Sequence, residues 1–155
     1  MSDELEIDIL AELENTDLSD VSTERPLLPQ GNYVLRVIKV AIEENNKKTG
    51  HNVNIELETT APAESEADHR GNTQTIQPGW KVYNTLSLVA TPKYSKERIL
   101  QSLAAFQEAA LHEKESGFMY NVNSGLFIGA ELTASLNIER SDKWGDKNRV
   151  NRYLK

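Results

Sequence analysis

The sequence of 155 residues contains no cysteine, which excludes disulfides, thiolate metal ligands and cysteine nucleophiles. Its three histidines, His51, His69 and His112, lie far apart without ligand spacing, so the sequence does not predict a zinc site. It also has no glycine-rich phosphate loop and no G-x-S-x-G motif. Its carboxylates do not single out a general acid paired with a general base. We therefore expect a protein that is not an enzyme and that holds no metal or cofactor.

Long apolar runs are also missing, because no stretch approaches the roughly 18 residues that a membrane helix needs. The N-terminus is acidic where a signal peptide would be basic and then apolar. We therefore expect a cytoplasmic protein without a membrane partner. The chain is long enough to bury a real core as a single domain.

Basic residues are absent from the first 24 positions, which carry nine acidic residues. These acids are Asp3, Glu4, Glu6, Asp8, Glu12, Glu14, Asp17, Asp20 and Glu24. The remainder of the chain holds all 17 basic residues and the other 15 acids, so its formal charge is +2 although the whole chain is at −7. This division favours an acidic interaction tail attached to a mildly basic body.

The tail also contains apolar residues, with Ile9 and Leu13 four positions apart. This spacing favours a short amphipathic helix over about residues 4–14 that forms on a partner. The alternative is a disordered tail that only solvates the protein. Prolines follow, so we divide the chain into an acidic tail of residues 1–28, disordered or partner-bound, and a domain of residues 29–155.

Within the domain, β-branched residues and alternation of apolar with polar residues predict five strands. The predicted strands are residues 32–42, 52–58, 80–90, 132–138 and 150–154. Between the second and third strands, residues 60–79 have no period and are rich in Ala, Pro, Glu, Ser, Asp and Gly. This composition predicts a long, mobile hairpin loop.

One helix is predicted between the third and fourth strands. Ser95 is a suitable N-cap, an apolar stripe runs from Ile99 through Leu103 and Phe106, and Gly117 follows the helix. The order is therefore three strands, one helix and two strands. It predicts a mainly β protein, a five-stranded OB-type Greek-key barrel with one α-helix between strands three and four.

OB barrels bind single strands across strands two and three, using cations for the phosphates and flat side chains for the bases. Trp80 is equally consistent with core packing, and Glu56 and Glu58 reduce the positive charge of this face. Arg152 and Tyr153 are neighbours on one strand, so at most one of them faces the groove. The candidate nucleic-acid-binding residues are Arg36, Lys39, Lys48, Trp80, Lys81, Tyr83, Arg140, Lys143, Trp144, Arg149 and Tyr153.

Several short segments match a known pattern. They read Pro-Gln-Gly-Asn-Tyr-Val at residues 29–34, Lys-Thr-Gly at 48–50, Trp-Lys-Val-Tyr-Asn-Thr-Leu-Ser-Leu at 80–88, Phe-Gln-Glu-Ala at 106–109 and Asn-Arg-Val-Asn-Arg-Tyr-Leu at 148–154. In these segments the sequence resembles a family of small phage-encoded proteins related to single-stranded DNA-binding proteins. The similarity covers about residues 29–155. It implies an OB-fold protein of phage replication and recombination, present in the host cytoplasm, and it carries over no catalytic residue.

Two interpretations of function follow. The first is a phage single-stranded DNA-binding protein without sequence preference, whose acidic tail recruits replication or recombination proteins or occupies the groove when DNA is absent. The second is a phage structural or decoration component, or another protein–protein interaction module, that does not bind nucleic acid. The sequence leaves open the choice between DNA and RNA and the oligomeric state, including a homo-oligomer.

Overall fold

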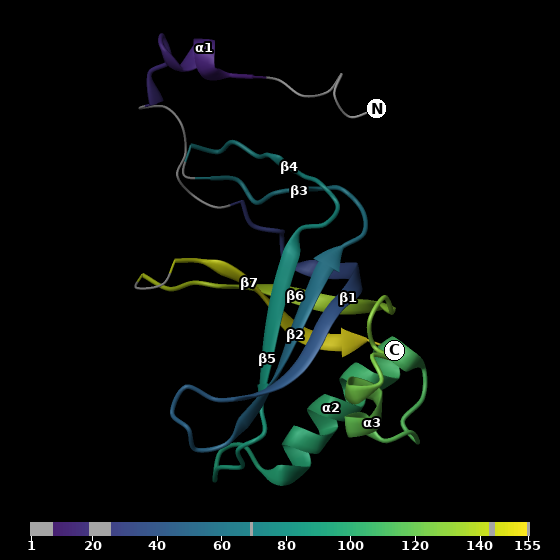
Figure 1. The fold of residues 1–155 in the computed structure, drawn as a ribbon. Coiled ribbons are helices and arrows are strands. Elements are labelled where there is room, and N and C mark those ends of the chain that lie inside the picture. The colour runs from purple at the N-terminus through teal and green to yellow at the C-terminus, as the bar shows by residue number, and fades with distance from the viewer. Residues whose placement is uncertain (1–7, 19–25, 69, 143–144, 155) are drawn as a thin grey trace.

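The computed structural model describes residues 8–18, 26–68, 70–142 and 145–154. Five strands form one antiparallel sheet in the order β5-β2-β1-β6-β7, which confirms the mainly β prediction (Figure 1). The strands are β1 (Gly31–Glu44), β2 (His51–Thr59), β5 (Lys81–Ser87), β6 (Glu131–Glu139) and β7 (Lys147–Leu154). β5 and β7 are therefore the two edges of this sheet.

Apolar and polar residues alternate along the strands, so the sheet has one buried face. In β2, for example, Val53, Ile55 and Leu57 are buried and the residues between them are not. β1 is the longest strand and pairs with β2 along one part and with β6 along another. A register shift between Val37 and Lys39 marks an irregularity in β1. Such irregularities bend and twist a strand, which suits a strand shared between two halves of a sheet.

Two helices, rather than the single predicted one, connect β5 to β6. The first is α2 (Lys96–Leu111), where the side chain of Ser95 accepts a hydrogen bond from the amide of Arg98. α2 ends at His112, which adopts a left-handed conformation with φ of 62° and donates its amide to the carbonyl of Glu108. The second helix, α3 (Phe118–Asn123), follows Gly117, the residue expected to end the single helix.

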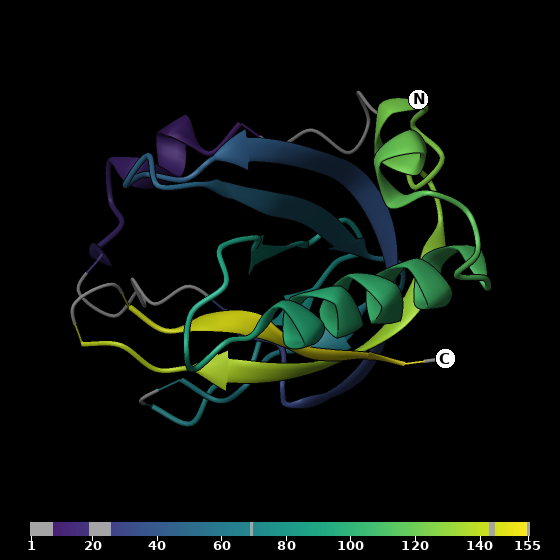
Figure 2. The same ribbon diagram turned by 90° about the horizontal axis from the view of Figure 1, so that it is seen from below.

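The helix α2 is held on the sheet by its apolar stripe. Figure 2 shows α2 lying across one end of the molecule beside β7 and β6. Phe106 is fully buried, with its ring centroid 4.9 Å from that of Phe127 and 5.1 Å from that of Tyr153. These aromatic contacts join α2 to both β7 and the segment that precedes β6.

Residues 60–79 form a short two-stranded ribbon, β3 (Ala63–Glu64) with β4 (Thr75–Ile76), in place of the long loop expected from their composition. Ile76 is buried, and the amide of Glu66 donates to the carbonyl of Leu27 at 2.7 Å. Leu28, the last residue assigned to the tail, is fully buried, and its amide donates to Asn148 Oδ1. Packing of the domain therefore begins before Pro29.

Before Pro26, the acidic tail is described over residues 8–18. It contains one short helix, α1 (Leu10–Leu13), where the sequence predicted a helix over about residues 4–14. Ile9, Leu10, Leu13 and Leu18 are each at least half exposed. Across the described parts of the chain, no helix is long and apolar enough to cross a membrane.

Candidate functional site

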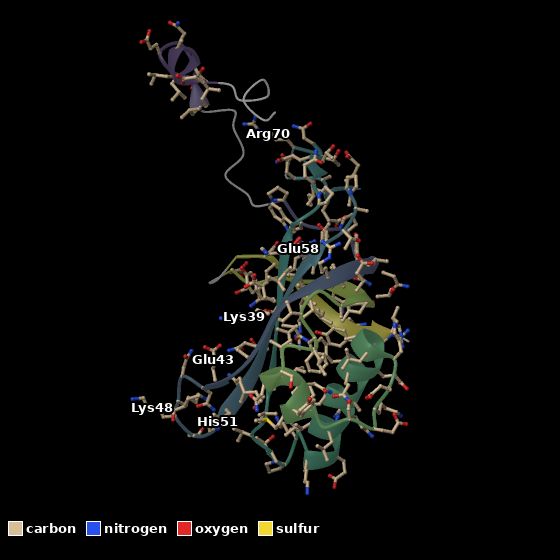
Figure 3. All side chains as sticks on the ribbon, turned by 45° about the vertical axis from the view of Figure 1, so that its right-hand side comes forward. Lys39, Glu43, Lys48, His51, Glu58 and Arg70 are labelled. Atoms are coloured by element: carbon tan, nitrogen blue, oxygen red, sulfur yellow. The ribbon has the colours of Figure 1, made fainter. Side chains whose placement is uncertain are left out.

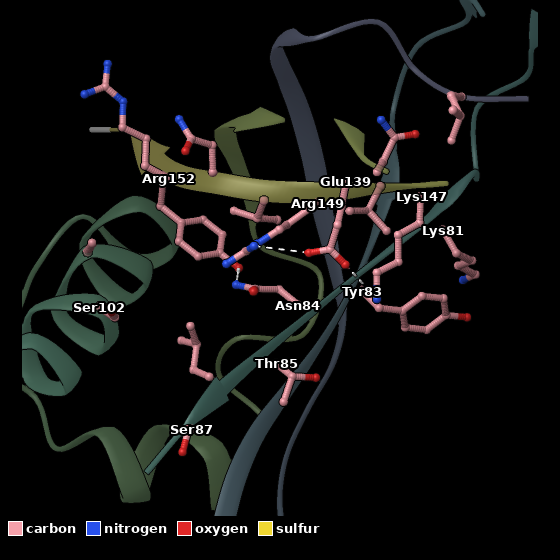
Figure 4. Close-up of a pocket in the computed structure, with 18 of the residues that line it drawn as sticks. Lys81, Tyr83, Asn84, Thr85, Ser87, Ser102, Glu139, Lys147, Arg149 and Arg152 are labelled. Atoms are coloured by element: carbon pink, nitrogen blue, oxygen red, sulfur yellow. Dashed lines mark hydrogen bonds and ion pairs between the residues drawn. The ribbon is translucent and has the colours of Figure 1, made fainter. Parts of the chain in front are cut away.

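The two edge strands of the sheet and α2 enclose a cleft of about 1380 Å³ (Figure 4). All of β5, most of β7 and the first half of α2 line it, together with Pro26 and Leu27. Pockets for small molecules have volumes of roughly 300–1,000 Å³. The cleft is therefore large enough for part of an extended polymer.

Basic side chains outnumber acidic ones among the described residues that line the cleft. The five basic residues are Lys81, Arg98, Lys147, Arg149 and Arg152, and the two acidic residues are Glu139 and Asp146. Glu139 and four of the five cations come from the sheet, Asp146 comes from the β6–β7 turn, and Arg98 comes from the first turn of α2. The cleft thus gathers positive charge from three elements that are distant in the sequence.

Some of these cations already have a carboxylate partner. Glu139 lies 3.1 Å from Arg149 Nη1 and 3.5 Å from Lys147 Nζ, and Figure 4 shows its pair with Arg149. Both cations are two-thirds exposed, so these ion pairs are weak and can exchange with another anion. Arg98 and Arg152 make no ion pair within the part of the chain that the structure describes.

Two tyrosines of the cleft differ in what they offer to a ligand. Tyr83 on β5 is 59% exposed, so its ring is available for stacking. Tyr153 on β7 packs edge-on against Phe106, and its hydroxyl accepts a hydrogen bond from Asn84 Nδ2 at 2.7 Å. Burial raises the pKa of Tyr153. Tyr153 is therefore a neutral structural residue whose bond with Asn84 links the two edge strands.

The polar face of the sheet carries mixed charge. Lys81 Nζ lies 3.4 Å from Glu56 and 3.7 Å from Glu58, and Lys39 stands opposite Glu56 in the register of β1 and β2. Arg36 pairs with Glu131 at 3.0 Å. Cross-strand neighbours of opposite sign cancel one another on this face. The excess of positive charge therefore lies in the cleft rather than on the polar face.

The cleft brings together five of the eleven predicted site residues: Trp80, Lys81, Tyr83, Arg149 and Tyr153. Trp80 is half-buried and packs against the hydrophobic core. It therefore contributes to core packing and also lines the cleft. Lys143 and Trp144 lie outside the described residues.

The other four predicted residues lie outside the cleft lining. Figure 3 shows Lys39 and Lys48 along the β1–β2 hairpin, with Lys48 in its exposed turn. Arg36 is on β1, and Arg140 is in the β6–β7 turn, 2.7 Å from Asp146. The hydrogen bond from the Arg140 guanidinium lowers the pKa of Asp146.

Sequence reasoning missed the contribution of α2 to the cleft. Arg98, Gln101, Ser102 and Ala105 line it, and their spacing of i, i+3, i+4 and i+7 places them on one face of the helix. This polar face runs beside the apolar stripe of Ile99 and Phe106. The same period of 3.6 residues that predicts the buried stripe also places these four residues on one face, so the signal for it is present in the sequence.

Other kinds of site have less support. No group of three or more histidine, acidic or cysteine side chains able to hold a metal ion occurs within residues 8–18, 26–68, 70–142 and 145–154. Comparison with known proteins finds no family model and no curated protein that matches the chain. What the protein does is therefore argued from the cleft itself.

Proposed function

We propose that this chain is a single-stranded DNA-binding protein of phage replication or recombination, and that the strand lies in the cleft between β5, β7 and α2. The observation that carries this proposal is the excess of cations in the cleft, where Arg98 and Arg152 are unpaired in the described structure and the exposed ring of Tyr83 belongs to the same lining. Cations for the phosphates and an aromatic ring for the bases are what binding without sequence preference requires.

The sheet order also supports an OB-type fold. In the OB-fold the first strand pairs with the second and fourth, and the barrel closes between the third and fifth. Here β1 pairs with β2 and β6, and β5 and β7 correspond to the third and fifth strands. The hydrogen bond between Asn84 and Tyr153 joins these two strands through side chains. We propose a partly open barrel, with the helix α2 between strands three and four.

The test is a titration of a labelled oligo-dT at two salt concentrations, with a duplex of equal length as the comparison. If about four phosphates are contacted, a fourfold rise in salt weakens binding by about 50-fold. The duplex is expected to bind far more weakly, because its bases are not free to stack on Tyr83. Absence of binding to oligo-dT at low salt would overturn the proposal.

Replacement of Glu139 by glutamine is expected to tighten binding of oligo-dT by about three- to tenfold. The change removes a carboxylate that pairs with Lys147 and Arg149 and that would repel a phosphate. Glu131→Gln is the matched control, because Glu131 pairs with Arg36 outside the cleft. Equal effects of the two substitutions on the fluorescence titration would argue against the cleft as the binding site.

Deletion of residues 1–24 is expected to tighten binding of oligo-dT by about tenfold, because it removes nine acids and no base. The tail would otherwise compete with the phosphates for the cations of the cleft. The measurement is the affinity at low salt, where the difference should be largest, and at high salt, where it should shrink. An unchanged affinity would contradict competition between the tail and DNA, but it would not contradict DNA binding itself.

A second candidate is a protein–protein interaction module, such as a phage structural or decoration component. It is favoured by four large apolar side chains exposed in and after α3: Met119, Tyr120, Leu126 and Ile128. Each is more than half exposed. The oligo-dT titration also separates the two candidates, since only the first requires DNA binding. In either case, the exposed Ile9, Leu10 and Leu13 of the tail support its use for recruiting a partner protein.

A further inference from the structure

The carboxylates of the cleft are confined to one part of its lining. Glu139 and Asp146 both belong to the β6–β7 hairpin, where Lys147 and Arg149 also lie. Among the described residues, β5, the connection that follows it and α2 contribute no carboxylate to the lining. The cation of the helix, Arg98, therefore lies on a side of the cleft that has no acid of its own.

A hydrogen bond between the two edge strands separates this side from the rest of the cleft. Asn84 Nδ2 donates to the hydroxyl of Tyr153 at 2.7 Å. Figure 4 shows Ser87 and Ser102 on the opposite side of this bond from Tyr83. The bond thus marks off a polar part between β5 and α2, which we call the α2 compartment. It is lined by Ser87, Tyr94, Arg98, Gln101 and Ser102.

The α2 compartment is closed at one end by residues 88–95, which connect β5 directly to α2. The amides of Thr91 and Tyr94 each donate to the carbonyl of the other, and this tight turn carries Tyr94 into the lining. A Cβ added at Gly50 would lie 2.5 Å from Cγ2 of Val89, so the connection packs closely against the β1–β2 hairpin. A polymer that enters the compartment from the cleft meets this wall, so the compartment suits the end of a strand.

The side chains of the α2 compartment are donors suited to an anion. Arg98 and Gln101 are exposed, and their side chains make no hydrogen bond or ion pair with another described residue. The hydroxyl of Ser87 accepts the amide of Val89 at 3.1 Å, so its own proton is available to a ligand. A guanidinium, an amide and a hydroxyl are all groups that donate to phosphate oxygens.

A phosphate at the end of a strand uses such donors better than one in the interior. A phosphate monoester has three acceptor oxygens and a charge of about −1.5 to −2 at pH 7. A phosphate within a strand is a diester with a single negative charge. The terminal group therefore gains more from Arg98 and from the further donors around it.

We propose that the α2 compartment binds the terminal phosphate of a single strand through Arg98, while the rest of the strand runs along the cleft past Tyr83. This inference rests on the proposed DNA binding and adds to it the recognition of a strand end. A strand without a terminal phosphate still binds, because Arg98 then contacts an internal phosphate, but it binds less tightly.

The first test compares three forms of one labelled oligo-dT, with a 5′-phosphate, with a 3′-phosphate or with neither, bound to the full chain. We expect one phosphorylated form to bind at least about tenfold more tightly than the unphosphorylated form, because it makes additional charged hydrogen bonds. The other phosphorylated form should gain little, since a strand of one direction presents only one end to the compartment. Equal affinity of all three forms, or equal gains at both ends, would overturn the inference.

The second test asks whether the preference depends on Arg98. Arg98→Gln should reduce the preference for the phosphorylated end to less than about twofold. Lys147→Gln is the control of equal charge, because Figure 4 shows Lys147 on the other side of the bond between Asn84 and Tyr153. It should weaken binding of every oligo and keep the preference. A preference that survives Arg98→Gln, or that both variants lose equally, would contradict the assigned site.

The third test uses small ligands with the ¹⁵N-labelled full chain in NMR spectroscopy. The thymidine monophosphate whose phosphate matches the preferred end should shift the amides of Ser87, Arg98 and Gln101, and thymidine should not. Inorganic phosphate distinguishes a strand end from free phosphate as the ligand. If it binds as tightly as the nucleotide, the compartment is a site for free phosphate and the inference is wrong.

These measurements separate failure of the inference from failure of the proposed function. If oligo-dT binds but the monophosphate shifts none of these amides, the site for the strand end is wrong and DNA binding stands. If oligo-dT does not bind at low salt in any of its forms, the proposed function fails, and the inference that rests on it fails too.

Discussion

Replacement of both Arg98 and Arg152 by glutamine is expected to weaken binding of oligo-dT by at least about 30-fold at moderate salt. The two guanidiniums line the cleft and make no ion pair in the described structure, so each can meet a phosphate without displacing a carboxylate. Hydrogen bonds to charged groups contribute about 1.5–3 kcal/mol each, and two such contacts account for the expected loss. The slope of log affinity against log salt should fall by about 1.4, which is 0.7 for each lost contact.

The control for this variant has the same charge but leaves the cleft unchanged. Lys47→Gln with Lys96→Gln removes two cations that are exposed and do not line the cleft. This control is expected to change the affinity of oligo-dT by less than about threefold, because charges at the surface act on a distant phosphate only through screened fields. If the control loses as much affinity as the double arginine variant, net charge rather than the cleft governs binding, and the site is wrong.

The strands of this protein were predictable because each one has a buried face. Val53, Ile55 and Leu57 alternate with polar residues in the sequence, and all three are fully buried in β2. Burial of one face of a sheet imposes a period of two, which is visible without any structure. The apolar stripe of α2 was visible for the same reason, with a period of 3.6.

The connections were harder to predict because their structure depends on distant partners. The ribbon of residues 63–76 has no period, yet it is ordered by main-chain bonding to Leu27 and by burial of Ile76. α2 ends at His112 through a left-handed residue that is not glycine, so the sequence lacked the usual signal for a helix end. Neither feature follows from the local sequence alone.

The candidate site was only half predictable, because the charge of a residue does not show which carboxylates will lie beside it. Lys81 and Arg149 both reach the cleft as their charge predicts, but each lies beside carboxylates of a neighbouring strand. Such pairs depend on which strands become neighbours in the sheet, and the pattern of a single strand does not show this. Arg98 was missed because it belongs to the helix and meets the edge strands only in the folded chain.

Phe106→Ala is expected to lower the free energy of unfolding by about 3–5 kcal/mol, the largest stability effect that we predict for a single substitution. Phe106 is fully buried between Phe127 and Tyr153, so its loss leaves a cavity where α2 meets the sheet. A domain of this size is stabilised by about 5–15 kcal/mol, so the variant should remain mostly folded at low temperature. Urea unfolding followed by circular dichroism measures the difference.

Leu100→Ala is the matched control, since Leu100 is on the same helix but 53% exposed. It should lower the free energy of unfolding by less than about 1 kcal/mol, and a loss equal to that of Phe106→Ala would mean that α2 is not packed as described.

The same pair of variants also tests whether the cleft binds DNA. Phe106 fixes α2 against β7, and α2 positions Arg98, so Phe106→Ala should weaken DNA binding even where the protein is folded. Leu100→Ala should leave the affinity unchanged, because Leu100 belongs neither to the hydrophobic core nor to the lining of the cleft.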